Sequence, residues 1–169
     1  MEPPATASPR ESTQTLRLAT DADEPALLAL FRPIVAAGEG YPQHPDEPIT
    51  PEAFRAYWIA PAVAVWVAEV SGELVGSYTM KANGVGRAAH VANAGYIVGR
   101  AHRGRGLGRR LVEHSLHQAT LLGFDAMQFN FVFADNPARS LYERLGFRVV
   151  GEVPAVIDGA PVLIYWRKL

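Results

Sequence analysis

The sequence of 169 residues contains no cysteine. This absence excludes disulfide bonds, thiolate metal sites and a cysteine nucleophile, and it is typical of a protein that works in a reducing compartment. We therefore expect a cytoplasmic location. Lysine is also scarce, at Lys81 and Lys168 only, and the formal net charge is -1. A chain with so little net charge is not expected to bind nucleic acid through its overall electrostatics.

Long apolar runs are missing as well. No stretch approaches the roughly 18 apolar residues that a membrane span needs, so no membrane insertion is expected. The first residues, MEPPATASPREST, lack the apolar segment of a secretory signal and are rich in Pro, Ser and Thr. We predict that residues 1–13 are a disordered tail. His114 and His117 are three residues apart on a predicted helix, but no third ligand accompanies them, and we predict no metal site.

The remaining residues, 14–169, are expected to form a single domain. Apolar residues make up 49% of the chain and charged residues 20%, which is ordinary for a globular protein. Patterns with a period of two predict strands at 15–20, 62–70, 73–82, 90–98, 124–133, 147–153 and 161–168. Patterns with a helical period predict helices at 21–38, 51–59, 106–122 and 136–146. This order predicts one mixed α/β domain.

A glycine-rich turn, RGRGLGRRL at Arg103–Leu111, opens the third predicted helix. Each glycine in a helix costs roughly 0.5–1 kcal/mol relative to alanine, so the backbone there must serve a purpose. The start of a helix leaves about four N–H groups without intrahelical partners and is partially positive. Glycines let such groups approach an anion closely, and several arginines surround them. The turn therefore predicts a diphosphate site.

Two widespread diphosphate motifs do not match this turn. A P-loop needs Lys and Ser or Thr after its second glycine, where this chain has Arg105 and Gly106. A dinucleotide fingerprint needs a third glycine, where this chain has Arg109. The pattern that does match is R-x-x-G-x-G at Arg103, Gly106 and Gly108. It resembles the pyrophosphate-binding motif of the GNAT acetyltransferase superfamily, whose ligand is acetyl-CoA.

A second stretch, DNPARSLYERLGF at 135–147, is similar to another GNAT signature, in which an Asn opens a helix that ends in L-Y-E-x-L-G-F. Counting back from Tyr142, the family position of this Asn falls on Asp135, whereas the asparagine is Asn136. Either the start of the helix is one residue short or Asp135 replaces the Asn. Asn136 followed by Pro137 is also typical of an N-cap with proline in the first helical position.

The resemblance covers nearly everything after residue 14 and is closest to an uncharacterised bacterial branch of the superfamily. It implies an α/β fold with a central mixed, mostly antiparallel sheet of about six or seven strands, flanked by about four helices. It also implies direct transfer of an acetyl group from acetyl-CoA to an amine, with a backbone N–H near Val98 stabilising the oxyanion. The cofactor-binding residues that it implies are Ile97, Val98, Arg103, Gly104, Arg105, Gly106, Leu107, Gly108, Arg109 and Asn136.

For the chemistry, Tyr142 matches the general acid of the family, although an aromatic packed on a helix face is the alternative. A phenol with a pKa near 10 can protonate a leaving thiolate. The strands HVANAGYIV and MQFNFVF contain no carboxylate. We therefore consider Glu39 as the base, directly or through water. Tyr41, in the same loop, and Asn93 and Asn130, on those strands, are candidates for binding the substrate.

The acceptor that the sequence favours is a small amine or an amino-acid-like molecule, because the Pro-rich stretch at 39–51 is expected to cover the site. Two alternatives remain open: acetylation of protein lysines or N-termini, and a catalytically idle acyl-CoA-binding module. The resemblance also implies a homodimer, and the apolar ending VLIYWRKL is a candidate for pairing.

Overall fold

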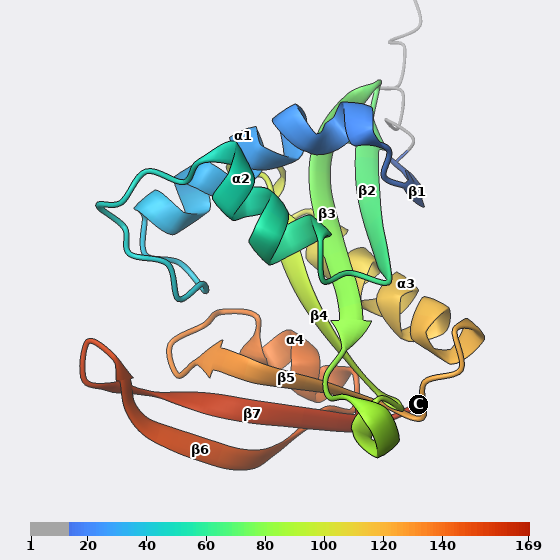
Figure 1. Ribbon diagram of the computed structural model, residues 1–169, viewed down its shortest axis with the longest axis vertical. Helices are drawn as coiled ribbons and strands as arrows, with labels where there is room; N and C mark the ends of the chain where they lie inside the picture. Colours follow the sequence, from blue (N-terminus) through green and yellow to red (C-terminus); the bar gives the residue numbers. More distant parts are fainter. Residues whose placement is uncertain (1–13) are drawn as a thin grey trace, which may run out of the picture.

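The computed structural model describes residues 14–169, so the tail predicted for 1–13 lies outside the described residues. Seven strands form one sheet in the order β1-β2-β3-β4-β5-β7-β6 (Figure 1). The strands are β1 Gln14–Leu18, β2 Ala64–Val70, β3 Glu73–Ala82, β4 Val91–Val98, β5 Ala126–Phe133, β6 Arg148–Ile157 and β7 Ala160–Lys168. The α-helices are α1 Glu24–Ala36, α2 Pro51–Phe54, α3 Leu107–Leu121 and α4 Arg139–Arg144.

All neighbouring strands in this sheet are antiparallel except β4 and β5, which run parallel. A parallel pair needs a crossover connection, and α3 supplies it. The parallel register contains only two pairs, Val91 with Ala126 and Ala92 with Met127. The predicted mixed, mostly antiparallel sheet with about four helices is therefore confirmed.

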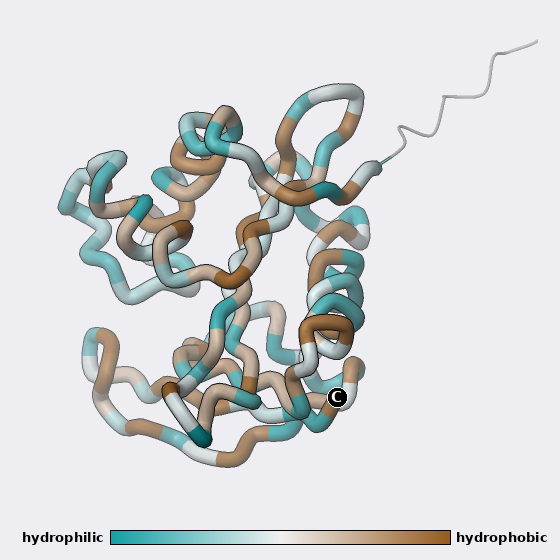
Figure 2. Tube along the Cα trace, turned by 45° about the vertical axis from the view of Figure 1, so that its right-hand side comes forward, coloured by the Kyte–Doolittle hydropathy of each residue, from teal (hydrophilic) through white to brown (hydrophobic). Residues whose placement is uncertain are grey.

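The sheet separates two apolar cores. On one face, Leu107, Leu111 and Leu116 form the apolar side of α3, which packs against β3 and β4 (Figure 2). On the other face, α1 and α2 contribute the second core, in which Phe31 and Trp58 are fully buried. Side chains of β4 alternate between the two faces, as a strand requires. The face covered by α1 and α2 will be called the acceptor face.

The helix predicted at 51–59 has these bounds, as a single α-helical turn, Pro51–Phe54, continued by a π-helix, Arg55–Ile59. One expectation about the strands is wrong. The final strand, proposed for pairing with a second copy, lies between β5 and β6 and has no free edge. The outer strand on that side is β6, because the hairpin returns β7 into the sheet.

A buried carboxylate joins β1 to the start of α1. Asp23 accepts hydrogen bonds from both terminal nitrogens of Arg17, each at 2.8 Å, and from the backbone N–H of Thr20 at 2.7 Å. The guanidinium of Arg17 holds the pKa of Asp23 far below its usual range. A depressed pKa means that the carboxylate stabilises the fold above its unfolded pKa, and that this stabilisation is lost as the pH falls.

We therefore predict that Asp23→Asn lowers the free energy of unfolding by about 1–2 kcal/mol at pH 7. The difference between the two proteins should shrink below about pH 4, where the carboxyl of the unfolded wild type becomes protonated. Urea unfolding at pH 7 and pH 3 measures both values. Asp158→Asn, in the exposed turn between β6 and β7, is a control. An equal loss at both pH values would show that the ion pair is not the cause.

Candidate functional site

The central feature of the site is the separation of β4 from β5. Their pairing ends at Ala92 and Met127, after which β5 continues beside β7 and β4 beside β3 (Figure 1). The N–H of Gly99 donates to Val75 O at 2.9 Å, so odd-numbered residues of β4 face β3. The backbone groups of Tyr96 and Val98 therefore face the space between the two strands, here called the strand gap. A planar, extended molecule can pair with backbone groups in such a gap.

The glycine-rich turn lies at the open end of the strand gap. Gly106 is the N-cap of α3 with φ +81°, and a Cβ there would contact nothing within 4 Å. The left-handed backbone, rather than a lack of space, is thus what favours glycine. The first helical bond runs from Arg110 N to Gly106 O, so the N–H groups of Leu107, Gly108 and Arg109 have no partner in the helix. These groups form a positive, open end of a helix, as an anion site requires.

The arginines of the turn have different partners. Arg103 approaches Val98 O with its Nε, at 3.4 Å, and pairs with Glu39 at 2.7 Å. Arg100 pairs with the same carboxylate at 3.1 Å. Arg109 pairs with Glu113 one helical turn away, at 2.8 Å. The predicted cofactor residues of the turn therefore do lie together, beside the end of β4.

Glu39 is placed differently from the free base that the sequence suggested. The guanidinium of Arg103, and then that of Arg100, lower the pKa of Glu39 below its ordinary value. A carboxylate held ionised by two arginines is a weaker proton acceptor than a free one. The structure thus favours an electrostatic role for Glu39 over a role as general base.

Tyr41, Tyr96 and Tyr142 come from three different elements around the strand gap. Tyr142 of α4 is buried beside Phe129, with ring centroids 4.8 Å apart, and burial raises its pKa to about 12. The hydroxyl of Tyr41 donates to Tyr96 O at 2.5 Å. After burial, the neighbouring Tyr142 contributes to raising the pKa of both Tyr41 and Tyr96. Tyr142 is therefore packed as an aromatic against Phe129 of β5, the strand on the other side of the gap.

Asn136 also borders the strand gap and caps the turn that leads into α4. Its Oδ1 accepts from Ala138 N at 2.8 Å, and its backbone O accepts from Arg139 N at 3.2 Å. The expected capping hydrogen bond is therefore present, with Pro137 after it, although α4 itself begins at Arg139 with Ala138 as its N-cap. A Cβ on Gly40 would lie 3.8 Å from Nδ2 of Asn136. Since Asn136 adjoins the loop over the gap, it fits the family position better than the exposed Asp135.

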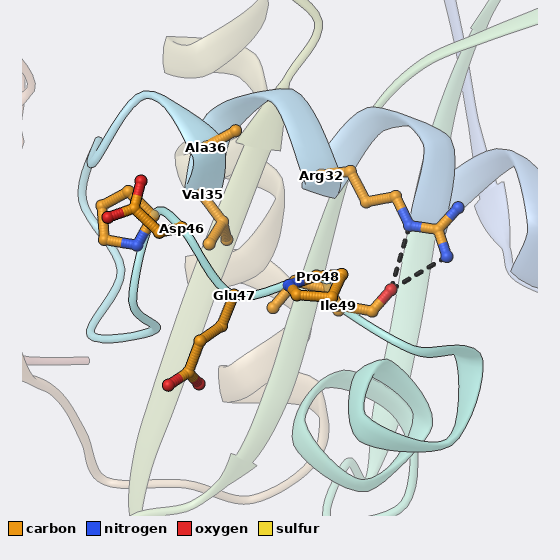
Figure 3. Close-up of a pocket in the computed structure, with 8 residues that line it drawn as sticks. Arg32, Val35, Ala36, Asp46, Glu47, Pro48 and Ile49 are labelled. Atoms are coloured by element: carbon orange, nitrogen blue, oxygen red, sulfur yellow. Dashed lines mark hydrogen bonds between the residues drawn. The ribbon is translucent and has the colours of Figure 1, made fainter.

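The loop 38–50, here called the acceptor loop, crosses the site. Glu39 pairs with Arg103, Gly40 lies beside Asn136, and Tyr41 donates a hydrogen bond to Tyr96 O. Its far end is fixed by Arg32 of α1, which donates twice to Ile49 O, at 3.0 and 2.9 Å (Figure 3). A pocket of about 270 Å³ lies between α1 and this end of the loop, and none of the predicted site residues lines it. The loop therefore covers the acceptor side of the strand gap.

Four amide side chains form a cluster on the acceptor face, here called the amide cluster: Asn83, Asn93, Gln128 and Asn130. Asn83 Oδ1 accepts from Asn93 Nδ2 at 3.0 Å and from Asn130 Nδ2 at 2.5 Å. Gln128 Nε2 donates to Asn130 Oδ1 at 2.8 Å. The structure thus brings together the two asparagines predicted to bind substrate. Asn83 and Gln128 were missed, and no local pattern in the sequence marks them.

Within residues 14–169, no group of His, Asp and Glu side chains is arranged to hold a metal ion. In the same part of the chain, no helix has both the length and the apolar character that crossing a membrane requires.

Comparison with known proteins places this geometry in a family. Residues 17–147 match the model of the acetyltransferase (GNAT) family. N-acetyltransferase aca1 of Schizosaccharomyces pombe is 38% identical over 93 residues, which are 54% of this chain and 44% of that protein. The chain therefore spans less than half the length of this relative.

Solved structures share the whole fold. A GCN5-related N-acetyltransferase from Kribbella flavida has a TM-score of 0.85 and 39% identity, over 92% of this chain and 98% of that one. A phosphinothricin acetyltransferase from Sinorhizobium meliloti, solved with AcCoA, has a TM-score of 0.81 and 22% identity, over 93% and 89% of the two chains. At that identity the likeness concerns the fold alone. On the family match and the separated strands together, the chain belongs to the acetyltransferase (GNAT) family.

Proposed function

We propose that the protein is an N-acetyltransferase that uses acetyl-CoA and acts on a small, amino-acid-like amine. The observation that carries the proposal is the strand gap with the glycine-rich turn at its open end. The N–H groups of Leu107, Gly108 and Arg109 suit the pyrophosphate, and Gly106 leaves the approach free of a side chain. Beyond the turn, Asn136 and the backbone of β4 line the strand gap. The residues present therefore fit acetyl-CoA.

Acetyl-CoA supplies a thioester carbonyl that the amine attacks, so that a C–N bond forms and CoA leaves as a thiol. The N–H groups of Tyr96 and Val98 face the gap and are suited to stabilise the oxyanion. The Tyr142 hydroxyl is suited to donate the proton that the departing sulfur needs. Its raised pKa, about 12, keeps that proton in place at neutral pH. Without a cysteine, direct attack in a ternary complex is favoured over a covalent acyl-enzyme.

The acceptor class is inferred from the acceptor face. The acceptor loop is fastened to Tyr96 through Tyr41, so it lies across the strand gap, which favours a small acceptor over a peptide. Lys81 lies opposite Asn93 in the β3–β4 register, so both side chains share this face. In residues 14–169, Lys81 has no carboxylate within 4.0 Å. An unpaired lysine among amides favours an acceptor that carries a carboxylate.

We also infer a cytoplasmic location and a homodimer. The first inference rests on the cysteine-free composition. The second rests on β6, the outer strand of the sheet, along which Val149, Val150 and Val153 are exposed. An apolar outer strand with free backbone groups is suited to pair with another strand.

The cofactor site is tested by titrating acetyl-CoA into the protein by calorimetry, beside Gly106→Glu. We predict saturable binding to the wild type and a loss of affinity of about 100-fold or more in the variant, because a carboxylate would face the pyrophosphate at a strained backbone. Gly72→Glu is a matched control, since Gly72 has φ +82° with nothing within 4 Å and lies in the distant β2–β3 turn. No binding to the wild type would overturn the proposed function.

Turnover is tested by the release of CoA thiol with a panel of amino acids, amines without a carboxylate, and peptides. Preferred turnover of the amino acids supports the proposal, and preferred turnover of peptides would establish the protein acetyltransferase instead. Acetyl-CoA binding without turnover of any amine would establish an idle binding module.

The general acid is tested with Tyr142→Phe. We predict that kcat falls about 100-fold while the affinity for acetyl-CoA is unchanged, because only proton donation is lost. In the wild type, kcat should show no descending limb below about pH 10, since the pKa of Tyr142 is raised to about 12. Tyr165→Phe is the control, because that hydroxyl already bonds Glu143 at 2.9 Å and Arg139 at 3.1 Å. An unchanged kcat in Tyr142→Phe would leave only the packing role.

The electrostatic role of Glu39 is tested with Glu39→Gln. We predict that the shape of the pH–rate profile is unchanged and that the KM for acetyl-CoA falls about two- to fivefold at low salt, because Arg103 and Arg100 lose a competing anion. Glu24→Gln, whose partner Arg55 lies outside the site, is the control. Loss of the ascending limb of the profile would restore Glu39 as the base.

A further inference from the structure

The amide cluster has a defined direction of hydrogen bonding. Asn83 Oδ1 accepts from both Asn93 and Asn130, and Asn130 Oδ1 is already taken by Gln128. Asn93 Oδ1 makes no hydrogen bond within residues 14–169, and one N–H of Asn130 Nδ2 is left over. Asn93 Oδ1 is therefore a free acceptor and the second N–H of Asn130 a free donor, on two neighbouring strands of the acceptor face.

Asn83 is held in place by a backbone hydrogen bond and by the tight packing of the residue that follows it. Its backbone N–H donates to Val91 O at 2.7 Å, which continues the β3–β4 pairing by one residue. The next residue, Gly84, lies so close to Ala88 that a Cβ would come within 2.8 Å of the Cβ of Ala88. The loop between β3 and β4 is thus folded tightly onto itself, and it holds the Asn83 side chain across the narrow end of the strand gap.

The position of the cluster is what connects it to the chemistry. Asn93 follows Ala92, the last residue of β4 that pairs with β5, and precedes Tyr96 by three positions, or about 10 Å along the strand. That length suits a small acceptor between the cluster and the backbone of Tyr96. Asn93 is half-buried and Asn130 is exposed, so water could satisfy both amides if stability were their only purpose.

We propose that Asn83 is a positioning residue: it fixes the amides of Asn93 and Asn130 so that they bind the polar end of the acceptor away from its reacting amine. This inference rests on the proposed N-acetyltransferase function. The free N–H of Asn130 donates a hydrogen bond to the carboxylate of the acceptor, and Asn93 Oδ1 accepts one from an N–H or O–H group of the acceptor other than its reacting amine. The Asn83 Oδ1 atom acts through these two residues, because it accepts a hydrogen bond from each of them.

The test compares Asn83→Leu with Asn83→Asp. Leucine removes the shared acceptor atom, whereas a carboxylate oxygen still accepts from two amides. We predict that Asn83→Leu raises the KM for the acceptor about tenfold, with kcat, the KM for acetyl-CoA and the melting temperature close to wild type. Asn83→Asp should return the acceptor KM to within about threefold of wild type. Gln118→Leu, on α3 across the sheet, is the matched control.

Two kinetic results would overturn the proposal. One is an acceptor KM in Asn83→Leu that matches the wild type. The other is a parallel loss of acetyl-CoA affinity and melting temperature that aspartate does not reverse, which would establish a structural role. If no amine is turned over, the proposed function fails, but the role of Asn83 can still be tested without turnover.

The side-chain amide signals of Asn93 and Asn130 in ¹⁵N NMR spectra should shift in Asn83→Leu and return to their wild-type positions in Asn83→Asp. Unchanged signals in Asn83→Leu would overturn the proposal.

Discussion

The separation of β4 from β5 is the constraint on which the rest of the site depends. After Ala92 and Met127 the two strands continue beside different partners, so backbone groups in the middle of a sheet are left unpaired. Such groups are costly unless something binds them. Side chains around the gap partner some of these groups: Tyr41 donates a hydrogen bond to Tyr96 O, and Arg103 approaches Val98 O. The glycine-rich turn lies at the open end of the gap. The fold thus leaves backbone groups in the strand gap that an extended polar ligand can bind.

Charge at the open end is partly compensated by the chain itself. The start of α3 and its arginines make a positive site, and Glu39 of the acceptor loop places a carboxylate between Arg100 and Arg103. A diphosphate and this carboxylate would compete for the same guanidinium groups. Occupation of the turn is therefore coupled to the position of the acceptor loop through one side chain. Under the proposed function, this coupling would link the cofactor site to the loop that covers the acceptor.

The sequence predicted the parts of the site that are local. Arg103, Gly106 and Gly108 are neighbours in the chain, and left-handed glycines at a helix start have a direct structural reason. The contacts that were missed join distant segments: Glu39 to Arg103, and Asn83 to Asn130. The capping hydrogen bond assigned to Asn136 is present, but the helix begins later, at Arg139, because an asparagine that closes a turn and one that caps a helix have the same local pattern.

The composition of the acceptor face bears on how the proton of the amine is removed. The facing positions of β4 and β5 carry amides, and the one acid of the acceptor loop that reaches the turn is held ionised by two arginines. Amides orient an amine but do not take its proton. An amine that arrives uncharged needs no strong base, because nitrogen loses its proton readily once its C–N bond to the acetyl group has formed. On this argument the rate should follow the free-base fraction of the acceptor, so its pH dependence reports the pKa of the substrate rather than that of an enzyme carboxylate.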